Sequence, residues 1–103
     1  MNAKILFCFL VLPVLSGFNT HTIDQKDYKF SRGEISVKVG DSVTFTNADE
    51  VAHNVYPRTP DAIFDLQWQA PGGKKLVKFD KVGEVEVRCA IHSKMKLLVK
   101  VVQ

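Results

Sequence analysis

The chain has 103 residues, of which 46% are hydrophobic and 24% charged, and its formal net charge is +3. This length suits a single domain and excludes enzymes that build an active site across several domains. The small positive excess lacks the dense basic stripe that nucleic-acid binding requires, so no nucleic-acid partner is expected.

The N-terminus has the order of a secretory signal peptide. A basic start over residues 1–4 precedes an apolar run over residues 5–15, and the small residues Ser16 and Gly17 follow. The apolar run is too short to cross a bilayer as a helix, and small residues are typical of the cleavage site of exported proteins. We therefore predict a signal peptide over residues 1–17. The mature single domain would span residues 18–103 and be periplasmic or secreted, without stable membrane insertion.

Removal of this segment leaves one cysteine. Cys8 lies in the apolar run, so the mature domain keeps only Cys89 and has no internal disulfide. Exported proteins normally pair their thiols. The unpaired Cys89 therefore has three explanations, which are an intermolecular bridge, an inert buried position or a metal.

The mature chain begins with a polar lead-in over residues 19–26, which lies outside any recognisable strand. Apolar residues then alternate with polar ones over residues 35–39 and again over residues 42–46, with a turn at Gly40-Asp41 between them. Alternation with a period of two predicts half-buried strands.

The middle of the chain is less regular. A polar turn over residues 47–50 leads to a third apolar stretch over residues 51–56. Prolines and adjacent glycines then interrupt residues 57–73, which predicts an irregular loop. Phe64 and Trp68 are expected to pack on the core beneath this loop.

Three further strands complete the prediction. Residues 75–79 re-enter the sheet with Leu76 and Phe79 facing inward, residues 82–89 alternate strictly, and residues 97–102 are rich in β-branched side chains. Many short strands joined by turns predict an all-β fold, either an antiparallel β-sandwich or a small barrel.

A cysteine, a histidine and a methionine follow one another on the loop between the last two strands. Thiolate, imidazole and thioether donors, here Cys89, His92 and Met95, favour copper over hard cations. A trigonal site of two histidines and one cysteine with a weak axial methionine needs a second imidazole. His53 lies in an apolar stretch at the expected rim of the sandwich, whereas His21 lies in the polar lead-in.

Each of these residues alone also has an ordinary structural explanation, as a buried thiol, a surface histidine or a core methionine. Their occurrence together at ligand spacing, in a chain without a disulfide partner, favours a metal site. Zinc is the chemical rival of copper, but methionine is a poor zinc ligand and a structural zinc site usually has a second cysteine. Copper is therefore the predicted metal.

The mature sequence resembles the cupredoxins, which are small type 1 blue copper proteins, and within them the amicyanin/plastocyanin-like group. Residues 39–47, the triplet His53-Asn54-Val55 and the loop from Cys89 to Met95 carry the resemblance. It implies a Greek-key cupredoxin-like sandwich with one type 1 copper ion. It further implies that His53, Cys89 and His92 are the equatorial ligands and Met95 the axial one.

The resemblance also implies how the loop is supported. The side chain of Asn54 is expected to tie the strand of His53 to the loop of Cys89. Ile91 stands where several cupredoxins carry proline, and its backbone N–H is expected to donate to the Cys89 sulfur. The surroundings of His92, with Pro57 as one contributor, are expected to be apolar.

The function that the resemblance implies is a monomeric periplasmic carrier of single electrons between a donor and an acceptor protein, with His92 as the exit and without enzymatic activity. One alternative is a protein of copper delivery or copper resistance with the same ligands, and another is a metal-free secreted sandwich used in adhesion or assembly. Six lysines either steer an acidic partner or only solvate strand edges; they are Lys74, Lys75, Lys78, Lys81, Lys94 and Lys96.

Overall fold

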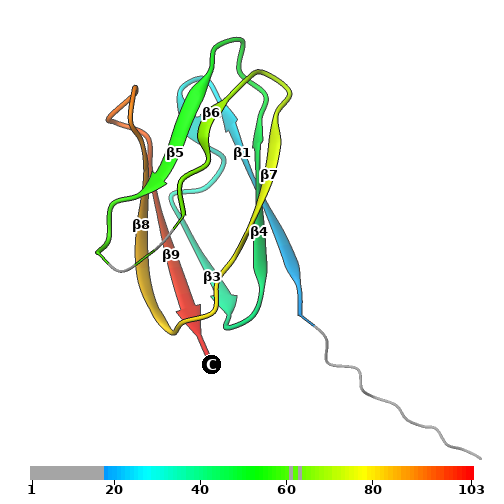
Figure 1. Cartoon of the computed structure of the whole chain (residues 1–103), viewed down its shortest axis with the longest axis vertical. Helices are drawn as coiled ribbons and strands as arrows, with labels where there is room; N and C mark the ends of the chain where they lie inside the picture. The colour runs from blue at the N-terminus through cyan, green and yellow to red at the C-terminus, as the bar shows by residue number, and fades with distance from the viewer. Residues whose placement is uncertain (1–17, 61, 63) are drawn as a thin grey trace, which may run out of the picture.

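The computed structural model describes residues 18–60, 62 and 64–103, so the predicted signal peptide and Cys8 lie outside the described part. Strands account for the regular structure of this part (Figure 1). Within the same residues no helix is long and apolar enough to cross a membrane. The strands are β1 Thr20–Lys26, β2 Lys29–Phe30, β3 Glu34–Lys38, β4 Ser42–Asn47, β5 His53–Pro57, β6 Gln67–Gln69, β7 Lys74–Lys78, β8 Gly83–Cys89 and β9 Lys96–Val102.

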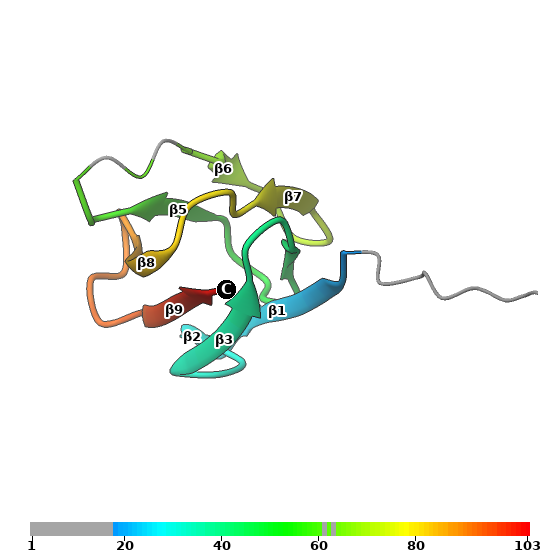
Figure 2. The ribbon, with the colours of Figure 1, turned by 90° about the horizontal axis from the view of Figure 1, so that it is seen from below.

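The strands form two sheets that enclose one interior (Figure 2). One sheet has the order β2-β1-β4-β7 and the other the order β3-β9-β8-β5-β6. The predicted all-β sandwich is therefore confirmed. The pairing is mixed rather than purely antiparallel, because β1 runs parallel to β4 and β3 runs parallel to β9. Between β2 and β4 the chain passes through β3, which belongs to the other sheet.

The last two strands follow the predicted alternation. In β9 the side chains of Leu97, Val99 and Val101 are buried, and in β8 those of Val87 and Cys89 are buried. Because β8 pairs with β9 in antiparallel register, both strands present one apolar face to the same interior. This arrangement places Cys89 at the buried end of a rigid strand.

The lead-in over residues 19–26, predicted as irregular, is strand β1. Ile23 and Gln25 face the interior from this strand. The Nε2 of Gln25 donates to the backbone oxygen of Thr46 at 3.0 Å and to Oε1 of Gln69 at 2.7 Å, whereas its buried Oε1 has no hydrogen-bond partner among the described residues. A buried polar side chain gives no hydrophobic signal, which explains why the strand was not recognised.

Two predicted core residues are exposed. Leu76 is 62% exposed and Trp68 is 66% exposed, so neither packs inside. Residues two apart share one face of a strand, and Val77 and Phe79 therefore point inward while Leu76 points outward. Phe64 does pack on the core as predicted, with its ring centroid 5.9 Å from that of Phe79.

The turn between β3 and β4 is closed by Asp41. Its carboxylate accepts hydrogen bonds from His21 Nε2 at 3.0 Å and from the backbone N–H groups of Asn19 and Lys38, each at 2.9 Å. These hydrogen bonds, that of His21 first, lower the pKa of Asp41 from 3.8 to about 2. The ionised carboxylate therefore stabilises the fold above the usual pKa, and this contribution is lost as the pH falls from 3.8 towards about 2.

We expect Asp41→Asn to lower the free energy of unfolding at neutral pH, because the amide loses one acceptor oxygen and the negative charge. The difference from the wild type should shrink as the pH falls from 3.8 towards about 2, where the wild-type carboxylate becomes protonated. Denaturant unfolding of the metal-free protein at several pH values measures both effects. Asp80→Asn, at an exposed aspartate, is the matched control. Equal stability of Asp41→Asn and wild type at neutral pH would contradict this account.

Candidate metal centre

Three of the predicted ligands meet at one end of the sandwich. His53 is the first residue of β5, Cys89 is the last residue of β8, and His92 lies in the loop that joins β8 to β9. Val55 pairs with Cys89 across the antiparallel β5–β8 ladder, and His53 lies two residues before Val55, on the same face of β5. The sheet register therefore brings a histidine and a cysteine that are distant in sequence to the same corner.

The donor atoms of these residues face one another. Sγ of Cys89 lies 3.7 Å from Nδ1 of His53 and 3.8 Å from Nδ1 of His92, and the two Nδ1 atoms are 3.0 Å apart. A point equidistant from all three atoms lies about 2 Å from each, close to the length of metal bonds to histidine nitrogen and cysteine sulfur. Two imidazoles and one thiolate are the equatorial donors that copper takes in trigonal sites. The residues present fit a copper ion.

A buried carboxylate fixes the orientation of His53. Nε2 of His53 lies 2.7 Å from Oδ2 of Asp49, which leaves Nδ1 to face Cys89 and His92. The same carboxylate accepts the backbone N–H groups of Asp27 at 2.7 Å and Tyr28 at 3.0 Å. Such partners set the tautomer and direction of a ligating histidine before a metal binds.

The charge of Asp49 is retained despite its burial. Burial by itself raises the pKa of the Asp49 carboxyl, but hydrogen bonds from Tyr28, His53 and Asp27 outweigh it and hold the pKa below its usual 3.8. The polar turn over residues 47–50 was recognised from the sequence, but nothing in it distinguished Asp49 from its neighbours as the partner of His53.

The strand of His53 and the loop of Cys89 are tied together by the backbone of Asn54. Its N–H donates to Sγ of Cys89 at 3.3 Å, and its carbonyl oxygen accepts the N–H of Ala90 at 2.8 Å. The expected tie through the Asn54 side chain is thus made by main-chain groups. Among the described residues, the backbone N–H that donates to this sulfur is that of Asn54. The hydrogen bond expected from the backbone N–H of Ile91 does not form there. Ile91 points outward and is 45% exposed.

The fourth predicted ligand, Met95, is buried in the core cluster and is 1% exposed. Its backbone N–H donates to the carbonyl oxygen of His92 at 3.0 Å, which closes the loop after Cys89 into a tight turn. His21, the other histidine considered, belongs to a different part of the fold. It lies on β1 beside Asp41 and pairs in register with Val43 near the start of β4.

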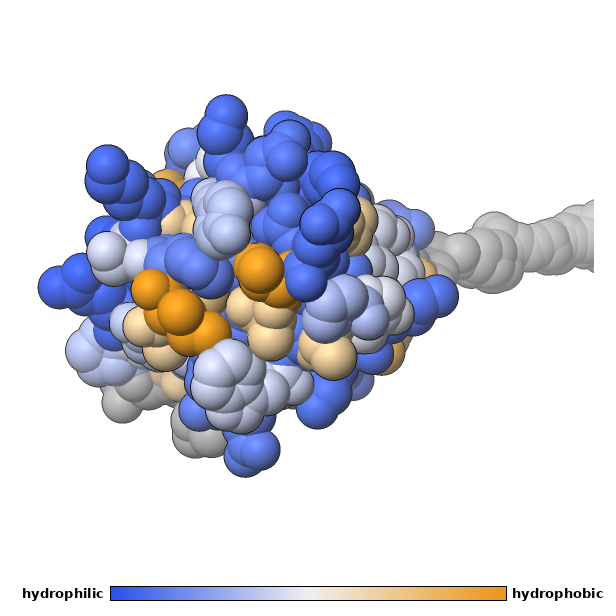
Figure 3. All heavy atoms as spheres, turned by 90° about the horizontal axis from the view of Figure 1, so that it is seen from above, coloured by the Kyte–Doolittle hydropathy of each residue, from blue (hydrophilic) through white to orange (hydrophobic). Residues whose placement is uncertain are grey.

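The surface outside the three donors is apolar at its centre. Seen from above, spheres of hydrophobic residues gather in the middle of this end of the molecule among hydrophilic ones (Figure 3). Tyr28, Val51 and Ile91 are exposed in the loops β1–β2, β4–β5 and β8–β9, and the ring of Tyr28 lies against that of His92. The six lysines named above do not all lie at this end of the molecule, because Lys74 pairs with Thr46 near this end of β4 whereas Lys78 pairs with Ser42 at the opposite end.

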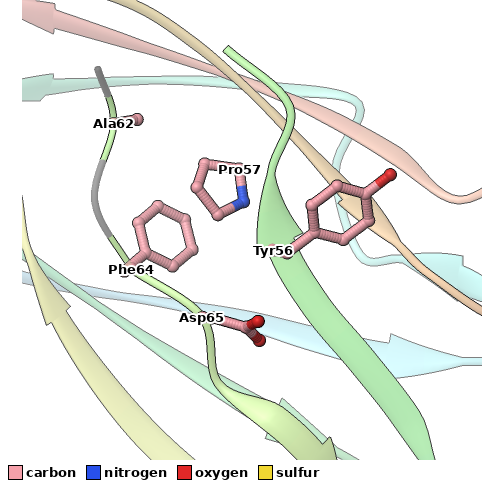
Figure 4. A pocket seen from close by; sticks show the side chains of 5 residues that line it. All are labelled: Tyr56, Pro57, Ala62, Phe64 and Asp65. Carbon is pink, nitrogen blue, oxygen red and sulfur yellow. The ribbon is translucent and has the colours of Figure 1, made fainter. Parts of the chain in front are cut away.

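Pro57 does not belong to this surface. It lines a shallow pocket of about 380 Å³ with Tyr56, Ala62, Phe64 and Asp65, which contains none of the three donors (Figure 4). Pro57 pairs with Val87, two positions along the β5–β8 ladder from Cys89 and away from the loop. The expectation that Pro57 contributes to the surroundings of His92 is therefore wrong.

Comparisons with known proteins agree with this geometry. The family model described as copper binding proteins, plastocyanin/azurin family, matches residues 19–102. The methylamine utilization protein MauL of Methylorubrum extorquens is 36% identical over 59 residues, which are 56% of this chain and 52% of that protein. The chain spans about half the length of the curated relatives it matches.

Solved structures show the same architecture. An amicyanin variant in its Cu(I) form superposes with a TM-score of 0.73 at 25% identity, over 80% of this chain and 81% of that one. A novel purple cupredoxin from Nitrosopumilus maritimus superposes with a TM-score of 0.72 at 22% identity, over 79% of this chain and 98% of that one.

Proposed function

Because this chain belongs to the plastocyanin/azurin family of copper-binding proteins, we propose that it carries single electrons between redox proteins through one type 1 copper ion. His53, Cys89, His92 and Met95 would hold the ion. The observation that carries this proposal is the convergence of two Nδ1 atoms and one Sγ atom within 3.8 Å of one another. When bound, the copper supplies a one-electron couple between its two oxidation states.

The surrounding residues keep the donors in place. The buried Asp49 orients His53, and the N–H of Asn54 orients the Cys89 sulfur. Ligands that are fixed before the metal binds change little between Cu(II) and Cu(I), which favours rapid electron transfer. His53 and Cys89 are fully buried, so solvent is excluded from that side of the centre.

Electron exchange would take place at the half-buried His92, which is the most exposed of the four ligands. A partner would dock on the apolar surface of Tyr28, Val51 and Ile91. Lys94, in the loop that joins β8 to β9, and Lys96, the first residue of β9, are both exposed and would steer a partner with an acidic surface.

Several features support a carrier rather than an enzyme. Four protein ligands leave copper no open position at which a substrate would bind. The predicted signal peptide supports a periplasmic location for the mature protein, which would act as a monomer. Copper delivery with the same ligands is the alternative function, and retention of the metal distinguishes the two.

A redox-cycling experiment separates these functions. The copper-loaded protein is reduced and reoxidised repeatedly while a Cu(I) chelator is present, and the copper left on the protein is measured after each cycle. A carrier keeps its copper and its visible spectrum through many cycles. Transfer of most of the copper to the chelator or to a metal-free acceptor protein within the first cycles would support delivery instead.

We expect Met95→Leu to retain copper and colour while its reduction potential rises. Loss of a weak thioether donor destabilises Cu(II) more than Cu(I), and the axial ligand tunes the potential of such sites. Leucine and methionine have similar volumes, so the fold should lose less than about 1.5 kcal/mol. Voltammetry measures the shift, and Leu97→Met, at a buried position of β9, is the control. An unchanged potential would remove Met95 from the ligand set.

A further inference from the structure

The two-residue turn between β1 and β2 has an unusual backbone. Asp27 and Tyr28 both adopt left-handed conformations, with φ of 54° and 60°. They connect the paired residues Lys26 and Lys29. Hairpin turns with positive φ at both positions favour Asn-Gly, and a bulky tyrosine there is uncommon and costs conformational free energy. Such residues persist where the surrounding structure imposes them, and they gather at functional sites.

The carboxylate of Asp49 accepts hydrogen bonds from both residues of this turn. Its Oδ1 accepts the N–H of Asp27 at 2.7 Å, and its Oδ2 accepts the N–H of Tyr28 at 3.0 Å. The same Oδ2 accepts Nε2 of His53 at 2.7 Å. One buried carboxylate therefore fixes both the turn and the first histidine of the metal centre.

The turn places the ring of Tyr28 against both histidines. Its centroid is 4.5 Å from that of His92, with an interplanar angle of 73°, and 6.0 Å from that of His53. Within the described residues, the polar contacts recorded for the His92 ring involve Nδ1, which faces the metal centre. Away from Nδ1, the ring packs edge-to-face against Tyr28, and its centroid lies 4.9 Å from that of His53.

We infer that Tyr28 is the positioning residue for His92, and that Asp49 couples the orientation of the two histidines by holding both His53 and the turn that carries Tyr28. This inference rests on the proposed copper site. His53 receives its direction from a hydrogen bond, whereas His92, on an exposed loop, receives it from the edge-to-face contact with Tyr28. The unusual backbone of the turn is then explained by the ring position that it produces.

Two substitutions of Tyr28 distinguish an effect on the orientation of His92 from an effect on the stability of the fold. Tyr28→Gly removes the ring but adopts positive φ freely, so relief of backbone strain offsets the lost packing of a half-exposed side chain. Its metal-free form should unfold at nearly the wild-type temperature. Its copper should nevertheless pass to a chelator about 2- to 12-fold faster, the factor that corresponds to one aromatic contact. Tyr28→Phe keeps the ring and should release copper at the wild-type rate.

Nuclear magnetic resonance of the metal-free protein gives a readout that does not depend on copper. The ring current of Tyr28 should shift the His92 ring protons in wild type and in Tyr28→Phe, and the shift should vanish in Tyr28→Gly. Identical His92 shifts in all three proteins, or a wild-type rate of copper release from Tyr28→Gly, would overturn the inference. Failure of the wild type to bind copper would instead overturn the proposed function, and the metal-free spectra would still decide the role of Tyr28.

Discussion

Replacement of Cys89 by serine should abolish the intense visible absorption of the copper-loaded protein. It should also weaken copper binding by at least about 100-fold, because loss of a metal ligand costs more affinity than loss of a residue that only hydrogen-bonds to a ligand. The absorption arises from charge transfer between a thiolate and Cu(II), and a serine hydroxyl is neither ionised nor a soft donor. The fold should survive, because serine is close to cysteine in size and the N–H of Asn54, now 3.3 Å from Sγ, faces the new oxygen. Visible spectra and the copper content of the dialysed protein measure the two effects.

Ala90→Ser is the matched control for this substitution. It adds a hydroxyl at the exposed neighbouring residue and leaves the sulfur of Cys89 untouched. The control should remain blue with full copper content. A Cys89→Ser protein that keeps the intense band would show that the chromophore lies elsewhere, and the assignment of the thiolate ligand would be lost.

Asp49→Ala should have the largest effect among residues that do not contact the metal. Asp49 is 7% exposed and accepts hydrogen bonds from His53, Asp27 and Tyr28. Its removal leaves these donors without a partner, and the free energy of unfolding of the metal-free protein should fall by about 3 kcal/mol. Copper affinity should also fall by about 10- to 100-fold, because the direction of His53 is no longer fixed.

Chemical denaturation and competition with a copper chelator measure these two losses. Asp80→Ala is the control, since Asp80 is 72% exposed and its nearest cation, Nζ of Lys78, is 3.7 Å away. The control should change stability by less than about 0.5 kcal/mol. If Asp49→Ala binds copper as tightly as the control does, the carboxylate has no part in orienting His53.

The positions of His53, Cys89 and His92 could be predicted because local patterns carry them. The alternation of β8 points Cys89 inward, and the tight loop after it returns His92 to the same corner. His53 opens an apolar strand next in the sheet to β8. Periodicity and loop length, which are properties of neighbouring residues, pointed to Cys89 and His92, whereas His53 was chosen because the site needs a second imidazole and because of the resemblance to the cupredoxins.

The support of the site could not be predicted, because it depends on pairing between distant segments. Gln25 pairs with Asn47 across the parallel β1–β4 ladder, and this register brings the β1–β2 turn to the β4–β5 loop. Only then does Asp49 meet the N–H groups of Asp27 and Tyr28. The strand β1 itself was not predicted, since its buried Gln25 gives no apolar signal.

Copper binding by the metal-free wild-type protein tests the central claim most directly. The measurement is a titration with Cu(II) followed by visible absorption and electron paramagnetic resonance. The account predicts an intense thiolate-to-copper band that saturates at one copper per chain, with the narrow copper hyperfine splitting of a trigonal thiolate site. A colourless product at saturation, or a band that grows beyond one copper per chain, would contradict it.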